Sequence, residues 1–299
     1  MLAVTRRAGP ALDASPLACR TLAESLERWP AVRILDTRDE AAFALGHPEG
    51  AGRLSPAEFT TRRMELPARE TAVLVVDDEP ARAHAAGLEL SARGFTRVAW
   101  LDAPITREPG GRISTAPAAR LWSPSPFVES VVACLPERAV AGVAPPRRAL
   151  DLACGSARAA VFLALEGWDA EGWDVDPSAL ERARAFACRQ AVEVRFRQLD
   201  LEAGPLPDPE PPFDLIVVVR YLHRPLFPWI ERALAPGGVL VYETFRDGQQ
   251  RFGPPRREQH LLRPGELLTA LPSLVVERYE ETADGVPPLF ARLVARKPG

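Results

Sequence analysis

Lysine is almost absent from this chain, because Lys297 is the only one and arginine supplies nearly all of the positive charge. The chain also lacks an excess of either sign, with a formal net charge of −3. A protein that coats nucleic acid through phosphate contacts needs a basic surface. The composition therefore disfavours a nucleic-acid-binding role.

Clustered cysteines and long apolar runs are missing as well. The four cysteines lie far apart and form no CxxC pair, so neither a disulfide framework nor a zinc site is expected, and no other metal site is predicted (Cys19, Cys134, Cys154 and Cys188). No apolar run is long enough to span a membrane, and residues 1–15 lack the apolar core of a signal peptide. We expect a cytoplasmic protein.

What is present is a regular alternation of strands and helices in two halves, which suits a length of 299 residues. The first half predicts strands at 32–35, 71–78 and 96–102, with helices at 39–45 and 81–93. Strand, helix and strand in alternation predict an α/β layer with parallel strands.

A stretch rich in proline, glycine, serine and threonine, residues 102–127, separates the halves. Such a composition is typical of a linker and an entry segment, and it places a domain boundary near residue 110. The predicted organisation is a first domain at 1–108, a linker and entry segment at 109–125, and a second domain at 126–299.

The second half alternates more clearly. It predicts strands at 149–153, 170–175, 192–198, 215–219 and 239–244, and helices at 156–166, 178–189 and 226–234. The last two strands, at about 274–280 and 289–296, are spaced as an antiparallel hairpin at the edge of the sheet. The fold class is a doubly wound α/β sheet, mostly parallel, preceded by a smaller α/β domain.

The loop in "ALDLACGSAR" joins the first strand of this half to its first helix. It has one glycine, Gly155, where a dinucleotide-binding loop would have GxGxxG, so a nicotinamide oxidoreductase is disfavoured. Small residues stand at alternate positions, Ala153, Gly155 and Ala157. They let the loop backbone approach a ligand closely without forming a full phosphate cradle.

Acidic residues follow the next two strands, in "GWDVD" and "QLDLE". The carboxyl ends of the strands carry the ligand in sheets of this type, and an acid after the second strand commonly binds ribose hydroxyls. Asp174 and Asp200 are therefore expected to bind an adenosine-type ligand.

These motifs, with "FDLIVVVRYLHR" and "LAPGGVLVYETF", resemble in order and spacing the class I S-adenosylmethionine-dependent methyltransferases. Within that class, "VYETFRDGQQRFGPPRREQHLLRPGELL" is most similar to small-molecule methyltransferases of the tellurite-resistance type. The resemblance implies S-adenosylmethionine as cofactor, Asp174 on the ribose diol and Asp200 near the adenine amino group, with Leu201 beside the ring. The implied cofactor-binding residues are Asp151, Ala153, Gly155, Asp174, Val175, Asp200, Leu201 and Val219.

Two residues depart from the family pattern. Ala157 replaces the third glycine of the first motif, and Ala159 replaces a common acidic or amide residue. If residue 157 has a positive φ, its methyl group is unfavourable there and close to the ligand. The sequence leaves open whether the loop binds the cofactor with altered affinity or has lost it.

Acceptor-side residues are expected after the fourth and fifth strands. Tyr221 and His223 are the candidate catalytic residues, with His223 as a base; packing and helix capping are the alternatives. Arg220, Glu243 and Arg251 are the candidate substrate residues, and a structural hydrogen bond would explain Glu243 equally well. Residues 248–257 form either a lid or a plain exposed loop. The Asn-Pro-Pro-aromatic motif of the adenine- and glutamine-modifying methyltransferases is missing.

The first half resembles the rhodanese-like domains from about Thr21 to Asp102, through "ILDTRDEAAFALGHPEGA". The resemblance rests on Asp36, Arg38, Glu40, Phe43, Gly46, His47, Gly50 and Ala51. In active members a persulfide-carrying cysteine follows the central strand. Here "VVDDEPARA" has Asp77 at that position, with Arg82 as the closing arginine, and a carboxylate cannot carry a persulfide.

Two hypotheses follow. The first is methyl transfer to a small-molecule acceptor, with a thiol or chalcogen compound as one candidate. In this hypothesis the rhodanese-like domain is silent and packs on the methyltransferase or mediates a homodimer. The second is a non-catalytic scaffold or sensor built from two degenerate domains, which binds S-adenosylmethionine or nothing.

Overall fold

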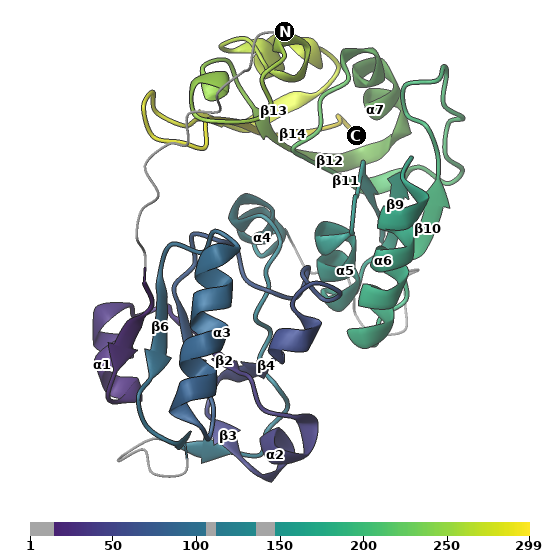
Figure 1. Cartoon of the computed structure of the whole chain (residues 1–299). Coiled ribbons are helices and arrows are strands. Elements are labelled where there is room, and N and C mark those ends of the chain that lie inside the picture. Colours follow the sequence, from purple (N-terminus) through teal and green to yellow (C-terminus); the bar gives the residue numbers. More distant parts are fainter. Residues whose placement is uncertain (1–14, 106–111, 136–146) are drawn as a thin grey trace, which may run out of the picture. The chain divides into compact units, whose positions relative to one another are not determined.

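A computed structural model describes residues 15–105, 112–135 and 147–299 of the chain (Figure 1). The chain divides into two compact units, Met1–Trp122 and Ser123–Gly299. The boundary predicted near residue 110 and the N-terminal residues without a signal-peptide core lie outside the described residues. In the part of the chain that is described, no helix is long and apolar enough to cross a membrane.

The first unit is built on a five-stranded sheet in the order β1-β6-β5-β2-β4, with every neighbouring pair parallel. Its strands are β1 Leu17–Cys19, β2 Arg33–Asp36, β4 Ala51–Arg53, β5 Val73–Val76 and β6 Val98–Leu101. Its helices are α1 Leu22–Arg28, α2 Glu40–Leu45 and α3 Pro80–Ala92, with a 3-10 turn at Pro56–Glu58. The strand β5 is buried at all four residues, as expected for a central parallel strand covered on both faces.

The first unit extends further along the chain than the composition predicted. Strand β7 (Ile113–Ser114) pairs with β3 (His47–Pro48), and Ala119 donates its N–H to the carbonyl of Ala51 at 2.9 Å. A Cβ at Gly52 would lie 2.4 Å from the Ala119 carbonyl oxygen, so the missing side chain permits this close approach. Residues 112–122, placed in the linker by their composition, therefore belong to the first unit.

The second unit contains a seven-stranded sheet in the order β10-β9-β8-β11-β12-β14-β13. Strands β8 to β12 run parallel, and β14 is antiparallel to both β12 and β13. This agrees with the predicted edge hairpin and confirms the predicted fold class. The strands are β8 Arg148–Leu152, β9 Asp169–Asp174, β10 Arg195–Gln198, β11 Phe213–Val219, β12 Leu234–Phe245, β13 Val275–Glu281 and β14 Phe290–Arg296.

Helices cover both faces of this sheet. Helices α5 (Arg158–Leu165) and α6 (Pro177–Arg189) pack against β8, β9 and β10, whereas α7 (Phe227–Ala233) packs against β12 (Figure 1). Alternate strand residues such as Leu150, Ile216 and Val218 join the core with α7. The remaining elements are α4 Pro126–Val132, α8 Glu266–Ala270 and 3-10 turns at Arg224–Leu226, Gln249–Arg251 and Glu258–His260.

The chain order of the strands reverses at β8. From β8 the chain proceeds outward through β9 and β10, and it then returns to β11 on the other side of β8. A ligand site is expected beyond the carboxyl ends of the strands at such a reversal. The loops after β8, β9, β10 and β11 meet there.

Candidate functional site

The loop after β8 has left-handed backbone at alternate residues. The φ angles are 59° at Ala153, 53° at Gly155 and 64° at Ala157. A non-glycine residue in this region costs about 1–2 kcal/mol, because Cβ crowds the following carbonyl. The side chain of Ala157 is fully buried, so its methyl group packs inside the domain and does not face solvent. Alanine at 157 therefore strains the loop backbone.

The carboxylate of Asp174 at the end of β9 is fixed by two backbone groups. The N–H of Gly155 donates to Oδ2 at 2.7 Å, and the N–H of Asp176 donates to Oδ1 at 2.9 Å. A Cβ placed on Gly155 would have no protein atom within 4 Å, so the space beside this residue is open. Asp174 thus joins the ends of β8 and β9 into one rigid ligand-facing corner.

Asp151 in β8 connects this strand to the first turn of α5, the helix that follows the loop. Its side chain is buried, and its Oδ2 accepts the N–H of Ala160 in the first turn of α5 at 3.0 Å. Burial, with the nearby charge of Asp174 as a smaller cause, raises the pKa of Asp151 to about 7. Asp151 therefore positions the helix that carries the loop.

A cavity of about 470 Å³ opens over these strand ends. Most of its lining residues are sequence-predicted site residues, and one, Glu202, was missed. The lining consists of Ala153, Asp174, Val175, Asp200, Leu201, Glu202, Val219, Arg220 and Tyr221. Asp151 and Gly155, also predicted, lie outside this lining. A volume of this size is typical of a small-molecule or cofactor site.

Glu202 connects the acceptor-side residues. It accepts the hydroxyl of Tyr221 at 3.3 Å, and its Oε2 lies 4.0 Å from Nδ1 of His223. Burial, followed by the charge of Glu202, raises the pKa of Tyr221, so the phenol stays protonated. His223 is half-buried and outside the cavity lining. The second acid in "QLDLE" is the sequence signal that could have identified Glu202.

Glu243, which the sequence predicted to point toward the site, is absent from the residues that line this cavity. Its carboxylate is 2% exposed, accepts the hydroxyl of Ser125 at 2.7 Å and pairs with Nε of Arg292 at 2.6 Å. Ser125, the residue before α4, donates to Oε1 of Glu243, and Arg292 of β14 pairs with Oε2, so both carboxylate oxygens are engaged. These contacts are of the structural kind that the sequence had left open as the alternative for Glu243.

Arg251 lies on the 3-10 turn Gln249–Arg251 and is exposed, outside the cavity lining. The turn itself is anchored, because Gln249 is buried and its Oε1 accepts the N–H of Leu289 at 2.8 Å. Residues 248–257 are thus fixed at one end and exposed at Arg251 and Phe252.

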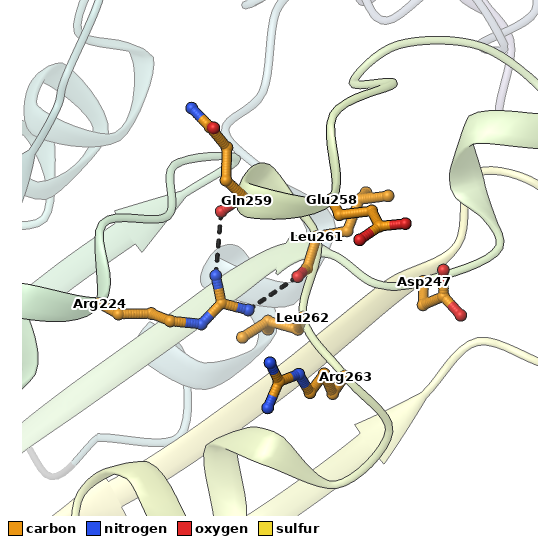
Figure 2. A pocket seen from close by; sticks show the side chains of 7 residues that line it. All are labelled: Arg224, Asp247, Glu258, Gln259, Leu261, Leu262 and Arg263. Atoms are coloured by element: carbon orange, nitrogen blue, oxygen red, sulfur yellow. Dashed lines mark hydrogen bonds between the residues drawn. The ribbon is translucent and has the colours of Figure 1, made fainter.

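A second cavity, of about 490 Å³, lies beside the ends of β11 and β12 and was not predicted. Figure 2 shows the guanidinium of Arg224 directed at two backbone carbonyls, of Gln259 at 3.0 Å and of Leu261 at 2.9 Å. Arg224 also pairs with Glu266, so all three of its guanidinium nitrogens are engaged. The lining is Arg224, Asp247, Glu258, Gln259, Leu261, Leu262 and Arg263.

In the first unit, Asp77 follows β5. It is 3% exposed, its Oδ2 accepts the hydroxyl of Thr37 at 2.7 Å, and its Oδ1 accepts the N–H of Glu79 at 3.1 Å. The neighbouring Arg38 is bound bidentately by Asp36 and also reaches Asp78. A cavity of about 340 Å³ adjoins this network and includes Arg82 in its lining.

Comparison with known families identifies both domains. Residues 149–238 match the family model of a methyltransferase domain, and residues 19–105 match that of a rhodanese-like domain. The chain therefore carries a methyltransferase domain preceded by a rhodanese-like domain, as predicted. The first of these implies an enzyme whose cofactor is S-adenosylmethionine.

Three curated relatives each match about a third of this chain. A ribosomal protein L11 methyltransferase of Thermus thermophilus is 42% identical over 96 residues, which are 31% of this chain and 37% of that protein. A trans-aconitate 2-methyltransferase of Methylobacterium nodulans is 35% identical over 34% of this chain and 39% of its own. A ubiquinone biosynthesis O-methyltransferase of Alkalilimnicola ehrlichii is 31% identical over 36% and 44%. The chain thus spans about a third to a half of these relatives.

Solved structures include TehB from Haemophilus influenzae, with a TM-score of 0.45 and 17% identity over 57% of this chain and 61% of that chain. The N-methyltransferase NodS from Bradyrhizobium japonicum has a TM-score of 0.42 and 21% identity, over 51% of this chain and 86% of its own.

Proposed function

We propose that the second domain transfers the methyl group of S-adenosylmethionine to a small-molecule acceptor by in-line displacement. The observation that carries this proposal is the 470 Å³ cavity, which unites Asp174, Asp200 and the left-handed loop at Ala153. A crevice at the reversal of strand order, lined by acids at successive strand ends, suits an adenosine-type ligand.

The lining fits this cofactor in charge and shape. Asp174, Asp200 and Glu202 provide three carboxylates, which favour a ligand with a positively charged sulfonium. The open space beside Gly155 leaves room for the ligand against the loop backbone. We assign Asp174 to the ribose hydroxyls, because its carboxylate is already oriented by two N–H groups, and Leu201 to the adenine ring.

The bound cofactor supplies an activated methyl group, so the chain has to align the acceptor and exclude water. Tyr221 acts as a protonated donor to Glu202 and not as a base. His223 is the remaining candidate for removing a proton from a neutral acceptor, and its Nδ1 lies 4.0 Å from the carboxylate of Glu202. We keep Arg220 and Arg251 as acceptor-side residues.

A small molecule is the preferred acceptor class. Two of the relatives carry names that refer to small-molecule products or substrates, ubiquinone and trans-aconitate, whereas one names a ribosomal protein. A thiol or chalcogen compound is the more specific acceptor that the tellurite-resistance resemblance suggests.

The rhodanese-like domain is proposed to be silent in sulfur transfer. Asp77 occupies the position where a persulfide-carrying cysteine would stand, and it is bonded to Thr37 and Glu79 as a buried carboxylate. We assign this domain a binding or structural role, in packing or in a homodimer.

The alternative is a scaffold that binds S-adenosylmethionine without turnover, which the strained alanine at 157 favours. A transfer assay with methyl-labelled S-adenosylmethionine separates the two. Acceptors would be offered as a panel of thiols, organic acids, selenite and tellurite. We expect a labelled product with the wild-type chain, none with Asp174→Ala and a reduced rate with Asp174→Asn, which keeps one acceptor oxygen. Cofactor binding without any product would support the scaffold.

A further inference from the structure

Among the described residues, Arg220 is the only basic one in the lining of the cofactor cavity, which also includes three carboxylates. We propose that the methyl acceptor carries an oxyanion group, a carboxylate or a chalcogen oxyanion, that pairs with Arg220. This inference rests on the proposed methyl transfer, and it makes Arg220 the residue that determines acceptor specificity.

The backbone of Arg220 has a strained, left-handed conformation. Its φ is 58°, a left-handed angle that costs a non-glycine residue free energy. The conformation is held by its N–H, which donates to the carbonyl of Glu243 at 2.7 Å where the pairing of β11 with β12 ends. A glycine would make the same turn without strain. The turn alone therefore gives no reason for an arginine, whereas a cavity-facing charge does.

The cavity carboxylates are engaged with other groups. Asp174 accepts two N–H groups of the cofactor corner, Asp200 accepts the N–H of Glu202 at 2.9 Å, and Glu202 accepts the hydroxyl of Tyr221. Among the described residues, no carboxylate lies within ion-pair distance of Arg220. Its guanidinium lies 5.6 Å from the ring centre of Phe290. An aromatic face orients the guanidinium and leaves its N–H edges available.

Arg292 provides an internal comparison. Its guanidinium also lies over Phe290, at 5.4 Å, but it is paired with Glu243 and Glu280. Two arginines thus share one aromatic ring, and the structure supplies acids to only one of them. A planar guanidinium with open N–H edges is the group that binds carboxylate-like anions bidentately.

The charge balance of the transfer suits an anionic acceptor. A lone pair of the acceptor forms a bond to the methyl carbon, the carbon–sulfur bond breaks, and its electron pair neutralises the sulfonium. An anion beside Arg220 is attracted by the sulfonium before transfer. If an oxygen of the anion is itself the nucleophile, no proton has to leave.

Three variants test the proposal in the full chain. Arg220→Gly removes the side chain and relieves the strain of the positive φ. Arg220→Lys keeps the positive charge but lacks the planar guanidinium that binds an anion bidentately. Arg184→Gln, on α6, is the control, because it changes an exposed arginine outside the cavity. Each protein is titrated calorimetrically with S-adenosylhomocysteine. The loaded protein is then titrated with malonate, citrate, selenite, and malonamide as the uncharged match.

We expect Arg184→Gln to bind S-adenosylhomocysteine like the wild type, the Arg220 variants to retain measurable affinity for it, and Arg220→Gly to have a higher urea midpoint. Anion affinity should fall roughly 10- to 100-fold in Arg220→Gly, which is the loss of one charge-assisted pair, less in Arg220→Lys, and not at all in Arg184→Gln. Preference for malonate or citrate over selenite would identify a carboxylate acceptor, and the reverse a chalcogen oxyanion.

Equal anion affinity in Arg220→Gly and the wild type, or equal binding of malonamide and malonate, would overturn the proposal. Neither result depends on turnover. Failure of S-adenosylhomocysteine to bind at all would instead contradict the proposed function, so the two failures are distinguishable.

Discussion

Ala157 adds one methyl group to the loop after β8, and this methyl group affects the stability of the loop. The sequence showed that a glycine is replaced, but only the backbone angles, φ 64° and ψ 35°, show that the replacement is strained. We expect Ala157→Gly to raise the free energy of unfolding by about 1 kcal/mol, because glycine adopts this region without a steric penalty. Urea unfolding measures the change.

The matched control for this prediction is Ala164→Gly in α5, where glycine replaces alanine in a helical residue. That change should lower the free energy of unfolding by about 0.5–1 kcal/mol. Destabilisation by both glycines would contradict the account of the loop.

Asp151 makes a prediction about pH. Its pKa of about 7 in the folded chain lies above the ordinary value of about 3.9, so between these values the folded state binds more protons than the unfolded state. Stability from this group is therefore present at low pH and is lost as the pH rises toward 7. The Asp151→Asn variant lacks this titration.

The measurement is urea unfolding of both proteins at several pH values between about 4 and 8. The stability of the wild type relative to Asp151→Asn should decline across this window and level off above it. A constant difference would mean that Asp151 is not shifted.

At the scale of elements, the central strands of the second domain were predictable where they are apolar runs, as in β11. The strand β11 was expected at 215–219 and extends over Phe213–Val219. Helix α4 was not predicted, because its seven residues follow a proline-rich stretch whose composition is typical of a linker. Strand β7 was missed for the same reason, since its two residues are fixed by pairing with β3.

Some features of the candidate site could be predicted from the sequence and others could not. Residues at or just beyond the strand ends, such as Asp174 and Asp200, were predictable because parallel strand ends converge at one edge. The direction of Glu243 was not, because it depends on Arg292 from a strand 49 positions away in sequence. The second cavity depends on Arg224 reaching the carbonyls of Gln259 and Leu261, which no local pattern shows.

The link between β12 and β14 has a measurable consequence. Glu243→Gln should lower the free energy of unfolding by roughly 3 kcal/mol, because it breaks a buried ion pair, while affinity for S-adenosylhomocysteine stays unchanged. Glu277→Gln removes the half-exposed partner of Arg296 and should cost less than about 1 kcal/mol. A loss of affinity for S-adenosylhomocysteine in Glu243→Gln without a loss of stability would contradict a structural role for Glu243.

At the scale of the whole molecule, the chain joins a methyltransferase domain to a rhodanese-like domain. We propose that Asp77 of this domain stands where active members carry their nucleophilic cysteine. We expect no sulfur transfer from thiosulfate to cyanide by the wild-type chain. Asp77→Cys places a thiol after β5, beside the carboxylates of Asp78 and Glu79, which disfavour the thiolate. Any activity of this variant should therefore be low at neutral pH and rise with pH, whereas turnover by the wild type would contradict the assignment.

The central claim is that the cavity over β8, β9 and β11 binds S-adenosylmethionine through Asp174. Calorimetric titration of the full-length chain with S-adenosylmethionine and S-adenosylhomocysteine tests it most directly, with Asp174→Ala as the comparison. The account predicts micromolar binding of both ligands by the wild type and its loss in the variant. No binding at millimolar ligand, or equal binding by Asp174→Ala, would contradict it.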